Sequence, residues 1–155
     1  MRRLLFIILS MVLFAKGQAR DFTLCFTNNA VSADITLCYT NMSIGADISI
    51  CITKGTYTDV DVCFTSMPSP ASIDVNITKY AVGADKTICI TSNAVGADKT
   101  IYLTNSSLAA DVCVGIYDSP TTFTKDIYVK GVDPKSLSIE NKISILYSLG
   151  FIKKK

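Results

Sequence analysis

Residues 81–104 read AVGADKTICITSNAVGADKTIYLT and contain two near-copies of one segment, residues 81–91 and 94–104. In each copy an Ala-Asp pair ends a turn-like stretch, and alternating apolar and polar residues follow it. Strict alternation that includes β-branched residues indicates a strand with one buried face. The Asn, Ser and Gly residues between the strands are typical of turns. The two copies therefore predict a 13-residue unit of one strand and one turn.

The same unit recurs along most of the chain. Steps of 13 residues, and one step of 12, separate the rows that begin at Asp21, Asp34, Asp47, Asp59, Ser72, Asp85, Asp98 and Asp111. A weaker row is expected from Asp126, after a step of 15 residues. When the first residue of a row is counted as position 0, positions 3 and 5 are large and apolar in these eight rows. Positions 2, 4 and 6 are mostly Thr, Ser or Cys.

One such row is not able to fold alone. Ordering its residues costs roughly 15–20 kcal/mol, and burying three or four aliphatic side chains returns only about 6–10 kcal/mol. We therefore expect an all-β array of about eight rows that pack on one another, as a β-solenoid, a series of hairpins or a more entangled arrangement. An apolar residue inside the turn, such as Val82 or Val95, is expected to touch the core. The Ala two residues later is expected to mark a tight bend.

The recurrent Ala-Asp turn with its short alternating strand resembles the septoil-knot domain family of bacterial exported proteins. The resemblance covers residues 21–131. It rests on Ala33-Asp34, Ala46-Asp47, Ala84-Asp85, Ala97-Asp98 and Ala110-Asp111. It implies a chain wound into a deep knot with seven crossings, and a family without an assigned activity.

Residues 1–19 have the three-part pattern of a secretory signal peptide. Residues 1–3 are positively charged, residues 4–14 form an apolar run of 11 residues, and the small residues Gly17 and Ala19 end the segment. The run is shorter than the about 20 residues that cross a membrane. We therefore expect cleavage after Ala19 and a mature chain without a membrane span, located in the periplasm or outside the cell.

The chain is expected to change character after the repeat domain of residues 20–133. Residues 134–155 are predicted to form a short helix and a lysine tail. Asp133 and Pro134 suit an N-cap and a first helical residue, and Gly150 suits a C-terminal cap. Apolar residues in this segment also alternate, so a strand is the alternative. We expect the helix to cover the open end of the array, where strand edges would be unpaired.

Two columns of side chains are candidates for chemistry. In an exported protein, disulfides are expected among Cys25, Cys38, Cys51, Cys63, Cys89 and Cys113. The pairing stays open, and a ladder of free thiols is the alternative. The second column consists of the turn residues Asp21, Asp34, Asp47, Asp59, Asp85, Asp98 and Asp111. Each Asp is expected to accept backbone hydrogen bonds in its own turn, with a calcium site as the alternative.

Charge and composition narrow the function. The net charge is +2, and it becomes −1 when Arg2, Arg3 and Lys16 leave with the signal peptide. This balance disfavours nucleic-acid binding, and the absence of His removes Ser-His-Asp and Cys-His catalysis. We expect a non-catalytic exported structural or binding module without cofactor or metal, whose partner is a protein or a surface. The alternative is a metal-dependent or hydrolytic enzyme that uses the Asp or Cys column.

The signal-peptide prediction is tested by the mass of the protein isolated from its native host. We expect the mature chain to begin at Arg20, because Ala19 is the small residue that a signal peptidase requires next to the cut. Intact-mass measurement distinguishes this product from the uncut chain. Recovery of a mature protein that still contains Met1 would reject the prediction.

Overall fold

The computed structural model describes residues 21–55 and 57–154, and the predicted signal peptide lies outside them. The described residues form nine strands and one α-helix, α2 (Ile139–Ser148). The strands are β1 (Phe22–Thr27), β2 (Ile35–Thr40), β3 (Ile48–Thr53), β4 (Val60–Thr65), β5 (Ile73–Thr78), β6 (Lys86–Thr91), β7 (Lys99–Thr104), β8 (Val112–Tyr117) and β9 (Lys125–Lys130). The predicted all-β repeat fold with a short C-terminal helix is confirmed.

The strands keep the 13-residue period more strictly than the sequence indicates. β9 occupies positions 1 to 6 of a row that begins at Thr124, 13 residues after Asp111. The predicted start of this row at Asp126 is therefore wrong. The row has Thr at position 0 and Asp at position 2, which displaces its apparent start by two residues.

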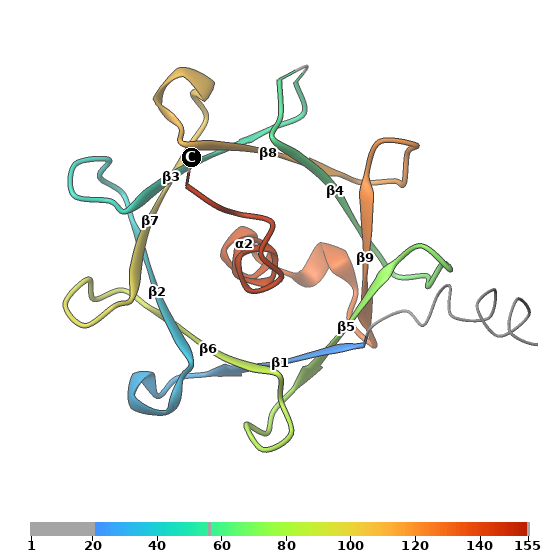
Figure 1. Ribbon diagram of the computed structural model, residues 1–155, viewed down its shortest axis with the longest axis horizontal. Coiled ribbons are helices and arrows are strands. Elements are labelled where there is room, and N and C mark those ends of the chain that lie inside the picture. The colour runs from blue at the N-terminus through green and yellow to red at the C-terminus, as the bar shows by residue number, and fades with distance from the viewer. Residues whose placement is uncertain (1–20, 56, 155) are drawn as a thin grey trace, which may run out of the picture.

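All nine strand pairs are parallel, and the sheet closes into a barrel in the order β1-β5-β9-β4-β8-β3-β7-β2-β6. Strands that follow one another in the sequence do not pair. Each of β1 to β4 lies between two of the last five strands. Each loop between consecutive strands moves the chain by two strand positions round the barrel. The chain therefore passes almost twice round the barrel between β1 and β9 (Figure 1).

Every pair of neighbouring strands is displaced by two residues in the same direction. Phe22 of β1 lies opposite Val75 of β5, for example, and Leu24 lies opposite Lys86 of β6. These displacements add up round the closed sheet and tilt the strands steeply, so that they follow the circumference in Figure 1. A barrel of nine such strands has a radius of roughly 12 Å, which is too wide for the strand side chains alone to fill.

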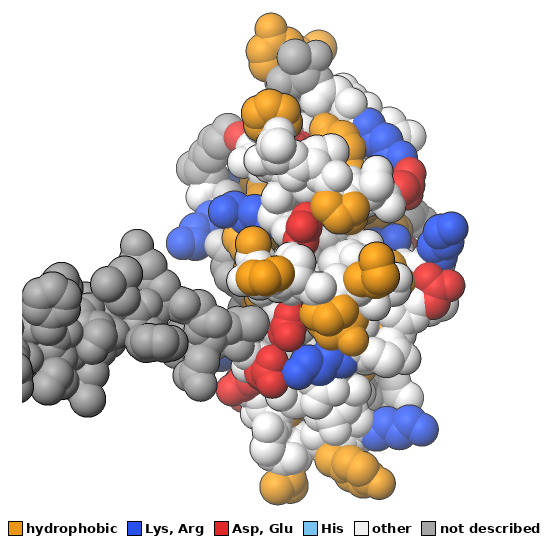
Figure 2. Space-filling model, turned by 90° about the vertical axis from the view of Figure 1, so that its right-hand side faces the viewer, with side chains coloured by type: hydrophobic (Ala, Val, Ile, Leu, Met, Phe, Trp, Pro, Cys, Tyr) orange, Lys and Arg blue, Asp and Glu red, His pale blue; other side chains and the backbone are white. Residues whose placement is uncertain are grey.

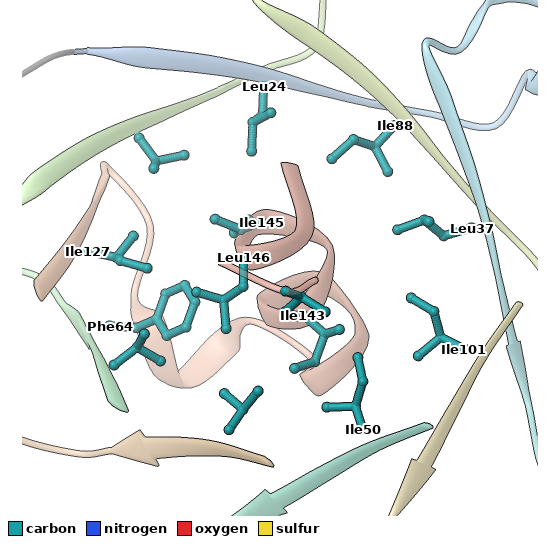
Figure 3. Close-up of a cluster of buried hydrophobic side chains, with 14 of the residues drawn as sticks. Leu24, Leu37, Ile50, Phe64, Ile88, Ile101, Ile127, Ile143, Ile145 and Leu146 are labelled. Atoms are coloured by element: carbon teal, nitrogen blue, oxygen red, sulfur yellow. The ribbon is translucent and has the colours of Figure 1, made fainter. Parts of the chain in front are cut away.

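Helix α2 lies at the centre of the barrel (Figures 1 and 3). An α-helix with its side chains is about 10–12 Å across, which matches the space left inside the strands. Ile143, Ser144, Ile145 and Leu146 are all fully buried, so the helix is enclosed on every side. The expectation that the helix covers unpaired strand edges at an open end of the array is wrong, because the closed sheet has no unpaired edge strand and the helix lies inside the barrel. Burial on all sides also explains why the apolar pattern fits both a helix and a strand.

The middle layer of the barrel packs directly against this helix. It consists of the position-3 side chains, and Figure 3 shows several of them pointing inward. All nine have no exposed surface: Leu24, Leu37, Ile50, Val62, Val75, Ile88, Ile101, Val114 and Ile127. The alternation predicted from the sequence therefore places positions 1, 3 and 5 inside the barrel and positions 2, 4 and 6 outside.

The caps of α2 agree with the sequence at one end only. Asp133 caps a short 3₁₀ turn at Pro134–Ser136, whereas α2 starts later, where the Ser138 hydroxyl accepts a hydrogen bond from the Asn141 N–H at 3.1 Å. At the other end Gly150 has a φ of +78°, and the Phe151 N–H donates to the Leu146 carbonyl at 3.0 Å. This is the glycine-dependent C-cap that the sequence predicts.

One polar contact ties the helix to the barrel wall. The Tyr39 hydroxyl donates to the Glu140 carbonyl at 2.8 Å and lies 2.9 Å from the Ser144 hydroxyl. Burial raises the pKa of Tyr39 far above its ordinary value of 10.0, so the hydroxyl keeps its proton. Because hydrogen bonds are directional, this contact helps to fix how α2 is rotated inside the barrel.

Burial at position 3 is tested by placing the same charge inside and outside the barrel. Ile88→Asp buries an unpaired carboxylate and is expected to destabilise the fold by about 4 kcal/mol or more. Val82→Asp is the matched control, because Val82 is 95% exposed and the change is expected to cost less than about 0.5 kcal/mol. Urea unfolding measures both free energies. Equal midpoints for the two variants would show that position 3 is not core.

Candidate functional site: the outer face and the loop tips

Most of the Asp residues at position 0 bind the backbone of a neighbouring strand. In each case the Asp N–H donates to the carbonyl of a position-2 residue, and the Asp carboxylate accepts from the N–H of the same residue at 2.7–2.8 Å. We call this arrangement an Asp bracket. The brackets are Asp34–Thr87, Asp47–Thr100, Asp59–Cys113, Asp85–Thr23, Asp98–Thr36 and Asp111–Ser49.

In the rows that begin at Ser72 and Thr124, the Asp and the hydroxyl residue exchange positions. These rows have Ser72 and Thr124 at position 0, and their carboxylates, Asp74 and Asp126, stand at position 2. The Ser72 hydroxyl donates to Asp74 at 2.9 Å, and the Thr124 hydroxyl donates to Asp126 at 3.1 Å. In these two rows the carboxylate is therefore bound by a hydroxyl of its own row, two residues earlier, and not by the backbone of a neighbouring strand.

The remaining column member, Asp21, lies beside a second acid. The β1–β5 register, continued by one residue, sets Asp21 opposite Asp74. Lys130 donates to the Asp21 carboxylate at 2.9 Å. This hydrogen bond is the main cause that raises the pKa of Lys130, and the charge of Asp74 adds to it. The positive charge of Lys130 therefore offsets the repulsion between Asp21 and Asp74, the one pair of carboxylates among the described residues that the strand register places opposite each other.

The Asp column therefore has a structural role, although not quite the predicted one. The carboxylates accept backbone N–H groups as expected, but from a strand more than fifty residues away (for example Asp34 and Thr87, 53 residues apart) instead of from their own turn. Each bracket carboxylate is thereby held against the sheet. Among residues 21–55 and 57–154, no group of three or more His, Cys, Asp or Glu side chains is arranged to hold a metal ion.

The Thr residues at position 6 start the loops. Each hydroxyl accepts a hydrogen bond from the N–H two residues later at 3.1–3.2 Å, a local turn that Thr commonly forms. This contact occurs at Thr27, Thr40, Thr53, Thr65, Thr78, Thr91 and Thr104. The regular Thr column is thus explained by turn formation.

All six Cys are buried on the outer side of the sheet as free thiols. The two-residue displacement sets each position-4 side chain between position 6 of one neighbouring strand and position 2 of the other. Cys25, Cys38 and Cys89 each lie between two Thr residues in this way. Cys51 and Cys113 are the two Cys that lie directly opposite each other, on β3 and β8. Disulfide formation stays a prediction.

Burial also sets the ionisation of two of these thiols. It is the main cause that raises the pKa of Cys51 above 9.0, and the neighbouring Cys113 adds to the rise. Burial likewise raises the pKa of Cys63, where Asp126 contributes further. Both side chains are therefore neutral thiols near pH 7 and behave as small apolar groups within the sheet.

The loops between strands place large apolar side chains in water. Every one of the eight loops that join consecutive strands has at least one, with exposed fractions from 69% for Met42 to 99% for Leu108. We call these side chains the loop tips: Val31, Met42, Ile44, Tyr57, Met67, Tyr80, Val82, Val95, Leu108 and Phe123. The loops project outward from the barrel (Figure 1). Figure 2 shows hydrophobic side chains along its edge, separated by polar and charged groups.

The expectation that the turns touch the core is therefore wrong for their large apolar residue. In the loops with glycine, Gly83 and Gly96 adopt φ of +85° and +86° just after the tip and turn the chain back. Two loops without glycine, β1–β2 and β7–β8, contain a 3₁₀ turn instead, at Ala30–Ser32 and Ser107–Ala109. The sequence signal was present, because one apolar residue recurs among polar turn residues. The sequence did not indicate whether this side chain points toward the core or toward solvent.

An open groove separates two neighbouring loops. Tyr57 and Leu108 line its sides, and Cys113 lies between the loops that bear them. A smaller hollow near the start of the C-terminal segment is lined by Asp118, Lys135 and Lys142, which mix both charge signs. The groove thus combines exposed apolar side chains with a thiol.

Comparison with protein-family models, curated proteins and solved structures gives no match. The resemblance to septoil-knot domains therefore stays a prediction. Within the described part of the chain, none of the helices has the length and apolar character needed to cross a membrane. The candidate site accordingly rests on the geometry of the outer face alone.

The Asp brackets predict how stability depends on pH. The side-chain hydrogen bond from Thr87 is the largest cause that lowers the pKa of Asp34 below 3.8, and the backbone hydrogen bond from Thr100 does so for Asp47. Because folding favours the charged form, this stabilisation is complete above about pH 4 and is lost as the pH falls through the lowered values.

We expect the urea midpoint of the parent to fall more steeply below pH 4 than that of the Asp34→Asn/Asp47→Asn variant. Glu140→Gln, which removes a carboxylate outside the brackets, is the control and should follow the parent. A parent and a double variant with parallel pH profiles would contradict a role of the brackets in stability.

Proposed function

We propose that this protein is a non-catalytic, exported structural module that associates with copies of itself through the loop tips. The observation behind the proposal is that all eight loops expose a large apolar side chain. Export rests on the signal peptide expected at residues 1–19. The proposal concerns an interaction surface, since fold alone does not define a function.

The tips are not needed to complete the core. The barrel is filled by the inner strand positions and α2, whereas tips such as Val31, Val82 and Leu108 are 95–99% exposed. Burying one aliphatic side chain of this size gains about 1.5–3 kcal/mol. Repeated large apolar side chains on a surface are typical of contact sites, so several tips together supply enough free energy for association.

The distribution of the tips favours a second copy of the chain as the partner. The loops radiate from the whole circumference (Figure 1), so a flat membrane or a single compact protein would reach only an arc of them. Copies placed edge to edge on several sides would cover many tips at once. Each copy also offers both halves of such a contact, because a tip such as Val95 protrudes and a groove lies between Tyr57 and Leu108.

The outer face supports a non-catalytic role. Six carboxylates of the Asp column are engaged in brackets with the backbone, and five of the six thiols are at most 3% exposed. A general acid or nucleophile has to reach its substrate. The repeated contacts hold these groups in one structural role in row after row.

The knot implied by the septoil-knot resemblance is retained as part of the proposal. It is supported by the almost twofold passage of the chain round the barrel and by the position of each early strand between two late ones. A chain arranged in this way crosses itself repeatedly. The knot holds the two passes together without any covalent link.

Self-association is tested on the mature chain by sedimentation velocity over a range of concentrations. Four neighbouring tips are replaced together, as Ile44→Ser, Tyr57→Ser, Val95→Ser and Leu108→Ser. We expect the parent to associate and the variant to dissociate at least about 100-fold more readily. Asn41→Ser/Asn105→Ser is the matched control, because it changes exposed polar residues of the same loops, and it should behave as the parent.

Two results would overturn the proposal. A parent that stays monomeric at the highest concentration reached would exclude self-association as the role of the tips. Flotation of the monomeric parent with phosphatidylcholine vesicles, lost in the four-tip variant, would assign the tips to a lipid surface instead.

A further inference from the structure

We propose that Cys51 and Cys113 form an intramolecular disulfide that joins β3 to β8 when the folded chain meets an oxidising disulfide. The inference does not rest on the proposed self-association, because the register of β3 and β8 is set within one chain. It selects one pair among the six Cys, which the sequence left unpaired.

The register brings these two side chains together. Cys51 and Cys113 are direct partners on neighbouring parallel strands, and both point to the outer side of the sheet. Neighbouring strands lie about 4.7–4.9 Å apart, within the roughly 4.4–6.8 Å that separates the Cα atoms of a disulfide. Cys113 also lies close enough to Cys51 to add to the rise of the Cys51 pKa.

The other Cys lack such a partner. Cys25, Cys38 and Cys89 each face Thr on both sides, and Cys63 faces Tyr117 and Asp126. Cys at the same position on two neighbouring strands are displaced along the sheet by two residues, so they meet only diagonally. The geometry therefore distinguishes a single pair.

The two thiols differ in access. Cys113 is 9% exposed and lies in the open groove between Tyr57 and Leu108, whereas Cys51 is 1% exposed. A small disulfide can enter this groove and reach Cys113 first. Cys51 lies beside Cys113 in the sheet and is placed to react second.

The exchange balances with oxidised glutathione as the oxidant. The Cys113 sulfur, after losing its proton, attacks one sulfur of the reagent and releases one reduced glutathione. The Cys51 sulfur then loses its proton and attacks the Cys113 sulfur of this mixed disulfide, which releases the second glutathione. The two thiols give up two electrons and two protons in total, and the reagent takes up both electrons as it becomes two thiols.

The bridge would link the two passes of the chain round the barrel. Cys51 and Cys113 are 62 residues apart in sequence, so the disulfide closes a long loop and restricts the unfolded chain. We expect the melting temperature to rise by roughly 10 °C on oxidation.

The experiment maps the thiols of the folded mature chain after exposure to oxidised glutathione. Remaining thiols are alkylated in denaturant, and the chain is cut with a protease that cleaves before Asp. This protease produces residues 47–58 and 111–117, each with a single Cys. We expect two of six thiols to be lost and these two peptides to be recovered as one disulfide-linked species.

Two variants serve as controls. Cys113→Ser should keep its five thiols and its melting temperature after the same treatment. Cys38→Ser, which changes a buried position-4 Cys flanked by Thr91 and Thr100, should lose two thiols like the parent. Six alkylated Cys in the treated parent, or a linked pair other than these two peptides, would overturn the proposal. The parent map decides this even where a variant fails to fold.

Discussion

A displacement of two residues between every pair of neighbouring strands, always in the same direction, is the constraint on which the rest of the structure depends. It tilts the strands and widens the barrel, which creates the space that α2 fills. The same displacement sets position 0 of one strand beside position 2 of the next, where the Asp brackets form. It also sets position 4 beside position 2, which is the contact between Cys51 and Cys113.

The two faces of the sheet have different structural roles. The inner face supplies the apolar surface that a single row is unable to bury alone, and Tyr39 adds the polar contact that orients the helix. The outer face satisfies its own polar groups. Within the described residues, every buried side-chain nitrogen or oxygen has a hydrogen-bond partner. With both faces occupied in this way, the loop tips are the large apolar side chains that stay exposed to solvent.

The sequence predicts what is local and misses what depends on distant rows. The period, the strands, the buried face and the Gly150 cap follow from nearby residues, and all agree with the structure. A strand could pair with the next row or with the rows four and five places along the chain. Because the rows of the repeat are alike, the sequence does not distinguish these two arrangements. The partner of Asp34, the central place of α2 and the outward direction of Val82 follow from that pairing. They were therefore not predictable from local pattern.

The pairing of each strand with partners four and five rows later also sets the order in which the chain can assemble. β1 has no partner until β5 has been synthesised, and the barrel closes only after β9 is present. All sheet contacts join residues more than fifty positions apart, as Phe22 and Val75 are, and such non-local contacts slow folding. A nascent chain of this kind has no closed sheet until its last strand has been made. Because the barrel is unable to close before β9 has emerged, this order of assembly would suit the export proposed above, which requires a chain that has not yet folded.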